Sequence, residues 1–171
     1  MKTEFIIWTS VCLISLILRT IYNTLKFNKR PIAQNKKVTV GTYIIMGIFW
    51  FSWFQMCFSD PVKTDLAEWI RYTGLALFVG GLLLIVFSFL EIRGIEPGEF
   101  AKSGIYSKLR NPMYLGFIIW FISFPVFLES LITLISSVVW ISFHIQWKWV
   151  EEKELQQENP AYRDYKKSTW F

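Results

Sequence analysis

Long apolar segments alternate with short polar ones along most of the chain. A membrane-spanning helix needs about 20 mostly apolar residues, and five windows reach or approach that length: 5–21, 40–58, 72–90, 113–128 and 131–149. A helix of a soluble protein would carry a polar face, and the window 72–90 has none. The pattern therefore predicts an all-α integral membrane protein with five transmembrane helices in a single membrane domain, residues 1–171.

The fourth and fifth windows are predicted to form a tight helical hairpin. Only Glu129 and Ser130 separate them. The window 113–128 holds 16 residues, which as a helix span about 24 Å, less than the roughly 30 Å of the hydrocarbon core. Pro125 weakens the last turn further. We expect the hairpin barely to reach the far face of the membrane, with Glu129 either at the interface or bound by a neighbouring group.

The third window is rich in small residues, with Gly74, Ala76, Gly80 and Gly81. Small residues let helix backbones approach each other closely in lipid. We therefore expect this span to lie centrally among the others. Glycines that are tolerated without a special contact remain the alternative.

The distribution of basic residues predicts the orientation. Thirteen of the 18 Lys and Arg residues follow the first, third or fifth window, and Lys148 stands at the end of the fifth, which gives fourteen on one side. Three lie on the opposite side, and Arg19 lies within the first window. Cytoplasmic loops collect Lys and Arg, so the N-terminus is expected outside and the C-terminus in the cytoplasm. The net charge of +5 is then a topology signal and an attraction to anionic membrane lipids, and we predict no binding of nucleic acid.

Several kinds of site are disfavoured. The two cysteines, Cys12 and Cys57, both fall within apolar windows, so neither a disulfide framework nor a metal site is predicted. No glycine-rich nucleotide fingerprint follows a strand. No small-residue cleavage site follows the first apolar run, which we interpret as an uncleaved span.

Polar residues stand at both ends of the apolar segment 117–149. Arg110 and Tyr114 precede it, and Glu151 and Glu152 follow it. A fixed positive charge, a hydroxyl and two carboxylates at the depth of the membrane surface can bind a small zwitterionic cofactor where it meets a lipid-borne substrate.

One face of the fifth helix leads toward these carboxylates. Trp140, His144, Trp147 and Glu151 share that face by their spacing. His144 either forms a structural hydrogen bond or lines the active cavity, because ionisable groups inside a membrane are candidates for function.

Five motifs then follow in order: Gly104-Ile105-Tyr106, Arg110-Asn111-Pro112-Met113-Tyr114-Leu115-Gly116, the hydrophobic hairpin, Glu151-Glu152, and Tyr162-Arg163-Asp164-Tyr165-Lys166-Lys167. In this combination the chain resembles the isoprenylcysteine carboxyl methyltransferases and, more loosely, the related membrane phospholipid methyltransferases. The resemblance covers roughly residues 100–168. It divides the chain into three N-terminal spans, residues 1–91, and a catalytic motif region with the hairpin and a cytosolic C-terminal helix or tail, residues 92–171.

The resemblance implies a multi-pass membrane methyltransferase that uses S-adenosylmethionine at the cytosolic membrane face and contains no metal. Its acceptor would be a lipophilic small molecule or a lipid-like substrate. Arg110 would be the catalytic residue. The cofactor-binding residues implied by the resemblance are Tyr106, Asn111, Tyr114, Gly116, Glu151 and Glu152.

Two positions depart from the family pattern. Asn111 stands where the family usually has His, and Ser168 stands where the carboxyl methyltransferases typically place an Arg. These replacements favour the alternative of a non-catalytic membrane scaffold or transport subunit that keeps the fold. Methylation of a phospholipid amine or a thiol is a further alternative, which stays within the enzyme class. The retention of Arg110, Tyr114 and both glutamates favours an enzyme.

Overall fold

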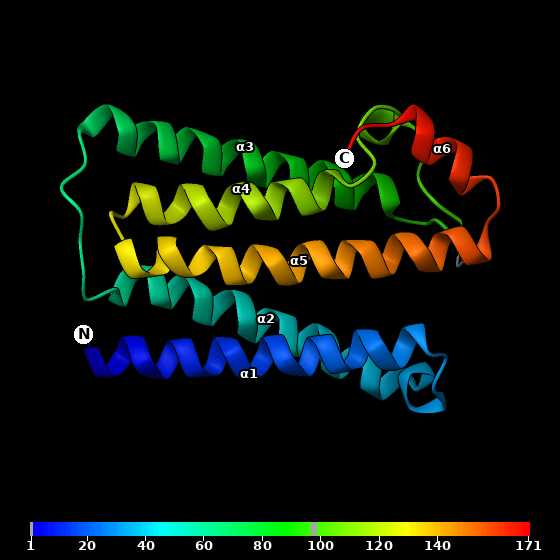
Figure 1. Ribbon diagram of the computed structural model, residues 1–171, viewed down its shortest axis with the longest axis horizontal. Coiled ribbons are helices and arrows are strands. Elements are labelled where there is room, and N and C mark those ends of the chain that lie inside the picture. Colours follow the sequence, from blue (N-terminus) through cyan, green and yellow to red (C-terminus); the bar gives the residue numbers. More distant parts are fainter. Residues whose placement is uncertain (1, 97–98) are drawn as a thin grey trace.

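The computed structural model describes residues 2–96 and 99–171, and the regular structure in these ranges is helical. Five of the helices lie alongside one another, and the sixth packs at one end of the bundle (Figure 1). In chain order the elements are α1 (Lys2–Phe27), η1 (Pro31–Gln34), α2 (Lys36–Ser59), α3 (Glu68–Ile92), η2 (Gly104–Ser107), α4 (Pro112–Phe127), α5 (Leu131–Glu158) and α6 (Tyr162–Ser168). The all-α prediction is confirmed, and a helix covers each predicted apolar window almost completely.

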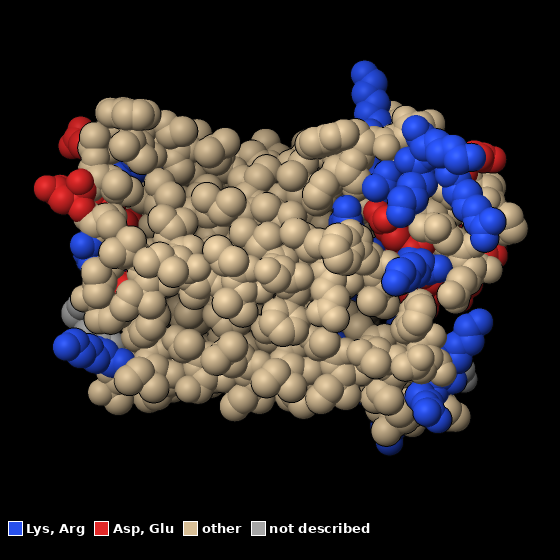
Figure 2. Space-filling view, viewed as in Figure 1, with Lys and Arg blue, Asp and Glu red and all other residues tan. Residues whose placement is uncertain are grey.

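The distribution of apolar surface is that of a membrane protein. Three of the described helices, α1, α2 and α3, are long and apolar enough to cross a membrane. The shorter helix α4 is also apolar, whereas α5 continues as a polar helix beyond its apolar part to Glu158. Charged side chains gather at the two ends of the molecule, and a broad uncharged belt lies between them on the face that Figure 2 shows.

The tip of the α4–α5 hairpin is tied to the segment that joins α2 to α3. The backbone N–H of Leu66 donates to Glu129 Oε1 at 3.1 Å, and Arg71 Nε lies 3.5 Å from Glu129 Oε2. Nearby, the buried carboxylate of Asp60 accepts hydrogen bonds from the backbone N–H and the hydroxyl of Thr133. Glu129 is therefore bound by neighbouring groups, which is one of the two alternatives that the sequence left open.

Two glycines of α3 allow close packing against α4. A Cβ atom at Gly74 would lie 2.9 Å from the carbonyl oxygen of Ser123, and one at Gly81 would lie 3.0 Å from that of Gly116. Gly80, in contrast, faces open space. The expected central position of this span is wrong: α3 lies at the edge of the bundle (Figure 1) and packs mainly on α4, because Gly74 and Gly81 meet α4 whereas the face that carries Gly80 meets no other helix.

Aromatic side chains fill the interior between α2, α4 and α5. Phe49, Phe121 and Trp147 surround the ring of His144, which is 1% exposed. Nδ1 of His144 lies 2.9 Å from the carbonyl oxygen of Trp140, one turn earlier in α5. This arrangement agrees with a structural role for His144 and supplies a rigid wall behind the polar end of α5.

Candidate functional site

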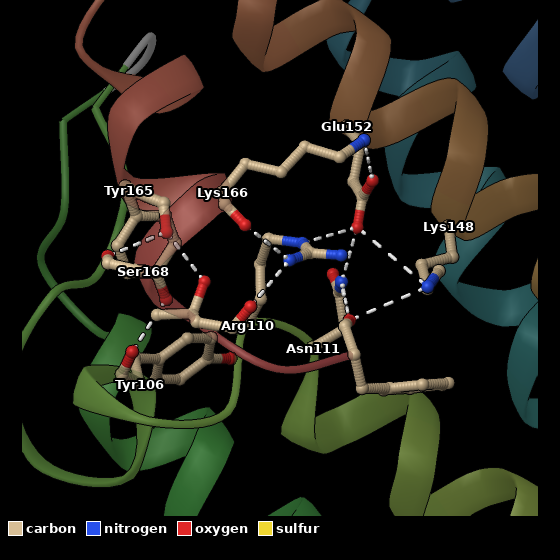
Figure 3. A network of polar contacts seen from close by, with 10 residues as sticks. Tyr106, Arg110, Asn111, Lys148, Glu152, Tyr165, Lys166 and Ser168 are labelled. Atoms are coloured by element: carbon tan, nitrogen blue, oxygen red, sulfur yellow. Dashed lines mark hydrogen bonds and ion pairs between the residues drawn. The ribbon is translucent and has the colours of Figure 1, made fainter.

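The C-terminal segment folds back over the loop that precedes α4. The backbone N–H of Trp170 donates to the carbonyl oxygen of Lys108, and that of Arg110 donates to the carbonyl oxygen of Trp170, both at 2.9 Å. These two bonds form a short bridge between segments far apart in the sequence. The bridge places the end of the chain beside Arg110 and the polar end of α5 (Figure 3).

Arg110 is held from two directions. Its Nε donates to Glu152 Oε1 at 2.7 Å, and its Nη1 donates to the carbonyl oxygens of Lys166 and Thr169, each at 3.2 Å. The side chains of Arg110 and Glu152 are only 10% and 3% exposed. A guanidinium with this many fixed acceptors has one orientation, which is what a positioned catalytic group requires.

Glu152 is the centre of a buried ionic cluster. Its carboxylate accepts from Lys166 Nζ at 2.7 Å and from Asn111 Nδ2 at 2.6 Å, in addition to Arg110. Lys148, one turn earlier in α5, lies 3.8 Å away. We call these five residues the Glu152 cluster (Figure 3).

The partners of Glu152 keep it ionised. Burial alone would raise the pKa of its carboxyl group, but the hydrogen bonds from Lys166, Arg110 and Asn111 outweigh burial and lower the pKa below its ordinary value. Asn111 also donates from Nδ2 to the backbone oxygen of Phe171 at 2.7 Å. The cluster therefore joins α4, α5 and the C-terminal segment through one fixed negative charge.

A polar cavity of about 240 Å³ lies between α1, α2 and the polar end of α5. Its lining includes Arg19, Tyr22, Thr42, Tyr114, Trp147 and Glu151. The hydroxyl of Tyr114 donates to Glu151 Oε2 at 2.8 Å. Desolvation by the surrounding protein raises the pKa of the Glu151 carboxyl group, and the hydrogen bond from Tyr114 opposes this effect in part.

Two further predicted residues lie elsewhere. Tyr106 is buried in η2, its carbonyl oxygen accepts from the hydroxyl of Tyr165 at 2.7 Å, and burial raises the pKa of its own phenol to about 12. Gly116 faces α3, because a Cβ atom there would lie 2.7 Å from the carbonyl oxygen of Gly81. The absence of a side chain at this position is thus explained by helix packing.

The structure sorts the predicted residues into separate groups. Arg110, Asn111 and Glu152 meet in the Glu152 cluster, whereas Tyr114 and Glu151 meet in the polar cavity. Lys148 and Arg19 contact these two groups and are not part of the sequence motifs. Both could have been found: Lys148 precedes Glu152 by four residues, which is one helical turn, and Arg19 is a charge within an apolar window.

Comparison with known proteins identifies a family and a relative. The pattern of the phospholipid methyltransferase family matches residues 69–160, more than half of the chain, and this range contains Arg110 and Glu152. Over 165 residues the chain is 24% identical to the protein-S-isoprenylcysteine O-methyltransferase of Dictyostelium discoideum, with 88% of this chain and 67% of that protein covered. No solved structure matches the chain.

Proposed function

The chain belongs to the phospholipid methyltransferase family, and we propose that it transfers a methyl group from S-adenosylmethionine to a small lipophilic acceptor, as an isoprenylcysteine carboxyl methyltransferase does. One observation supports this proposal most strongly. The 2.7 Å contact between Arg110 and Glu152 joins the two polar ends of the helical hairpin. Two of the sequence motifs therefore meet in one place, beside a cavity that a cofactor could enter.

We place the site at the cytosolic face of a five-span protein whose N-terminus is outside. The end of the bundle that holds α6 also holds most of the Lys and Arg side chains visible in Figure 2. That end contains the loop between α1 and α2, the Glu152 cluster and the polar cavity. Positive charge on this side agrees with a cytoplasmic location. The division into three N-terminal spans, 1–91, and a motif region, 92–171, is part of this proposal.

The residues present fit S-adenosylmethionine, which carries a carboxylate, an ammonium group, a ribose diol and an adenine. Glu151 would accept from the ammonium group or the ribose, and the Tyr114 hydroxyl, which lines the same cavity, would bind the carboxylate. Asn111 already donates to Glu152 and Phe171, so we assign it to holding Glu152 beside the pocket. When bound, the cofactor would supply a methyl group on a positively charged sulfur. We also assign Tyr106, Gly116 and Glu152 to the cofactor site, as residues that hold it in shape, because Tyr106 is buried in η2, Gly116 packs on α3 and Glu152 lies in the buried cluster.

The chain itself would contribute position and the exclusion of water. Glu152 and the C-terminal carbonyl oxygens hold Arg110 in one orientation. Phe171 covers the cluster from the other side, with its ring 4.1 Å from Lys148 Nζ. Methyl transfer depends on alignment and a dry site more than on proton transfer, so we assign Arg110 to the reacting groups and Glu152 and Gly116 to holding the pocket in shape.

A phospholipid amine is the second candidate acceptor. At the end of α6 the Ser168 hydroxyl donates to the carbonyl oxygen of Tyr165, so this position offers no cation to an acceptor carboxylate. The match to the phospholipid methyltransferase family also favours a phospholipid acceptor. The relative in Dictyostelium is named for its action on an isoprenylcysteine, and this favours a carboxylate as the methyl acceptor.

Binding of S-adenosylhomocysteine, the product of the cofactor, tests the proposal. We expect saturable binding to the detergent-purified protein by calorimetry, and a rise in Tm because the ligand binds the folded state. Glu151→Gln should weaken binding, whereas Asp65→Asn, an exposed carboxylate at the opposite end of the bundle, should not. No binding at a large excess of ligand would overturn the enzyme assignment in favour of a scaffold.

A further inference from the structure

Arg19 has an unusual environment for an arginine in an apolar helix. It lines the polar cavity from α1, and its Nε is buried without a hydrogen-bond partner. It takes part in none of the ion pairs among the described residues. The guanidinium lies instead near the rings of Tyr22 and Trp147, at 5.6 and 5.9 Å.

The other charged groups of the cavity have direct partners. Lys26 pairs with Glu154 at 3.0 Å, and Glu151 accepts from the hydroxyl of Tyr114. Arg19 is thus the cation of the described lining that forms no ion pair. A charge in a membrane segment is costly unless it is paired or serves a ligand, and a guanidinium is suited to binding a carboxylate or a phosphate.

We propose that Arg19 binds the oxyanion head, a carboxylate or a phosphate, of the lipophilic methyl acceptor at the α1 side of the polar cavity. This inference rests on the proposed function and adds to it a residue outside the motifs. Tyr114 and Glu151 enter the same cavity from α4 and α5. An acceptor head group held on Arg19 would therefore lie in the same cavity as Tyr114 and Glu151, two of the residues assigned to the cofactor.

The size and the opening of the cavity agree with a head group on a longer chain. About 240 Å³ is less than the 300–1,000 Å³ of typical small-molecule pockets, so a whole lipid does not fit. Tyr43 lines the cavity and is also 70% exposed on the outer surface of α2, next to Ile44, which is 61% exposed. The cavity therefore reaches the apolar outer surface of the bundle here, and the chain of an acceptor can extend into lipid.

Binding of simple amphiphiles to the purified full-length protein in a neutral detergent tests the inference. The probes are radiolabelled oleate, oleyl phosphate and oleyl alcohol, which differ only in the head group. The wild type should bind at least one of the two anions saturably, at one per chain, and the alcohol at least tenfold more weakly. Binding of oleate alone indicates a carboxylate acceptor, and binding of oleyl phosphate alone indicates a phosphate lipid. Equal binding of the alcohol would overturn the inference.

Three variants assign the binding to Arg19. Arg19→Gln should reduce the affinity for the bound anion by about tenfold or more, because a charge-assisted hydrogen bond is lost. Arg19→Lys should bind the anion more tightly than Arg19→Gln. Arg30→Gln removes an exposed charge from the nearby loop and should match the wild type. If Arg19→Gln binds like the wild type, or Arg19→Lys binds no better than Arg19→Gln, the inference is wrong.

Binding of S-adenosylhomocysteine separates this inference from the proposed function. Arg19→Gln should bind that ligand with wild-type affinity, which also shows that the variant is folded. A parallel loss of both ligands would mean that Arg19 binds the cofactor, and the inference would be overturned. Anion binding that depends on Arg19 in a protein without any affinity for S-adenosylhomocysteine would sustain the anion site and overturn the methyltransferase proposal.

Discussion

Glu151 and Glu152 are adjacent in α5, yet their carboxylates bind different partners in different places. Glu152 accepts from Arg110 at 2.7 Å inside the buried cluster, and Glu151 accepts from Tyr114 at 2.8 Å in the polar cavity. Successive residues of an α-helix point about 100° apart, so neighbouring side chains reach different surfaces. One glutamate therefore fixes the C-terminal segment, and the other is available to a ligand.

The first prediction concerns stability. Glu152→Gln removes the charge that balances Arg110 and Lys166, and breaking a buried ion pair costs about 3–5 kcal/mol. We expect a lower Tm in detergent and faster trypsin cleavage at Lys166 and Lys167, because the C-terminal segment loses an anchor. Glu154→Gln, which breaks an exposed pair with Lys26, is the matched control and should change little. Equal Tm values for the two variants would contradict the role of the Glu152 cluster.

The second prediction concerns the pH dependence of stability, to which Glu151 and Glu152 should contribute in opposite directions. The pKa of Glu152 is lowered by folding, so its contribution to stability is present above the ordinary carboxyl pKa and is lost as the pH falls through the lowered value. The pKa of Glu151 is raised, so its contribution is present below the ordinary value and is lost as the pH rises through the raised one. Because Glu151 is exposed, water weakens this effect, and it should be smaller than that of Glu152.

Tm measured from about pH 3 to about pH 7, across the ordinary carboxyl range, tests the direction in which each glutamate changes stability. Glu152→Gln should reduce the loss of Tm on acidification, and Glu151→Gln should reduce the loss of Tm as the pH rises. The same change of slope in both variants would show that the two carboxylates share one environment.

The sequence predicted the helices well because apolar length alone defines them. The short hairpin also follows from local spacing, since two residues separate its helices. The place of α3 at the edge was not predictable in this way, because glycine at close helix contacts does not reveal how many neighbours a helix has. Only the structure distinguishes Gly81, which contacts α4, from Gly80, which faces open space.

The candidate site was predictable in composition but not in arrangement. The motif order placed Arg110 and Glu152 in one predicted site, and in the structure these two side chains are in contact. It could not show that Gly116 packs on α3 or that the backbone oxygens of residues 166–171 satisfy Arg110 and Asn111. Such contacts depend on how the C-terminal segment folds back over the chain, which no local pattern encodes.

The third prediction compares alanine substitutions at two adjacent glycines of α3, Gly80 and Gly81. Gly81→Ala would place a Cβ atom 2.9 Å from Trp120 Cδ1 and 3.0 Å from the carbonyl oxygen of Gly116, and overpacking of this kind costs about 1–3 kcal/mol. Gly80→Ala meets nothing within 4 Å and improves helix propensity. We expect a lower Tm for the first variant and an unchanged or higher Tm for the second. The reverse order would contradict the packing of α3 on α4.

The fourth prediction concerns topology. Cysteines introduced at Lys36 and Ser168, both exposed at the end of the bundle that holds α6, should react with a membrane-impermeant reagent only from the cytoplasmic side. A cysteine at Asp65, exposed at the opposite end, should react only from outside. The native thiols of Cys12 and Cys57 are buried and should stay unlabelled. Labelling of positions 36 and 168 from opposite sides would be incompatible with the five-span arrangement.

The fifth prediction separates Arg110 from Glu152 in catalysis. Arg110→Ala should reduce kcat more than the affinity for S-adenosylhomocysteine, because an interaction that strengthens in the transition state is expressed in kcat. Glu152→Ala should weaken that affinity by about 1–3 kcal/mol, the usual cost of leaving a buried hydrogen-bonding partner unsatisfied. Both measurements require the detergent-purified protein and an acceptor that it methylates.

The double variant shows whether the two residues act as one unit. Arg110 and Glu152 are in direct contact at 2.7 Å, so each single variant leaves a buried charge with fewer partners. Residues in contact show non-additive effects, and we expect the double variant to lose less cofactor affinity than the sum of the single losses. Strict additivity would mean that the two residues act independently, and wild-type values for both single variants would remove them from the site. Arg110→Lys completes the series. It keeps the charge, but its single nitrogen cannot occupy the positions of both Nε, which bonds to Glu152, and Nη1, which bonds to the carbonyl oxygens of Lys166 and Thr169. Its kcat should therefore stay low if orientation, and not charge alone, is what Arg110 provides.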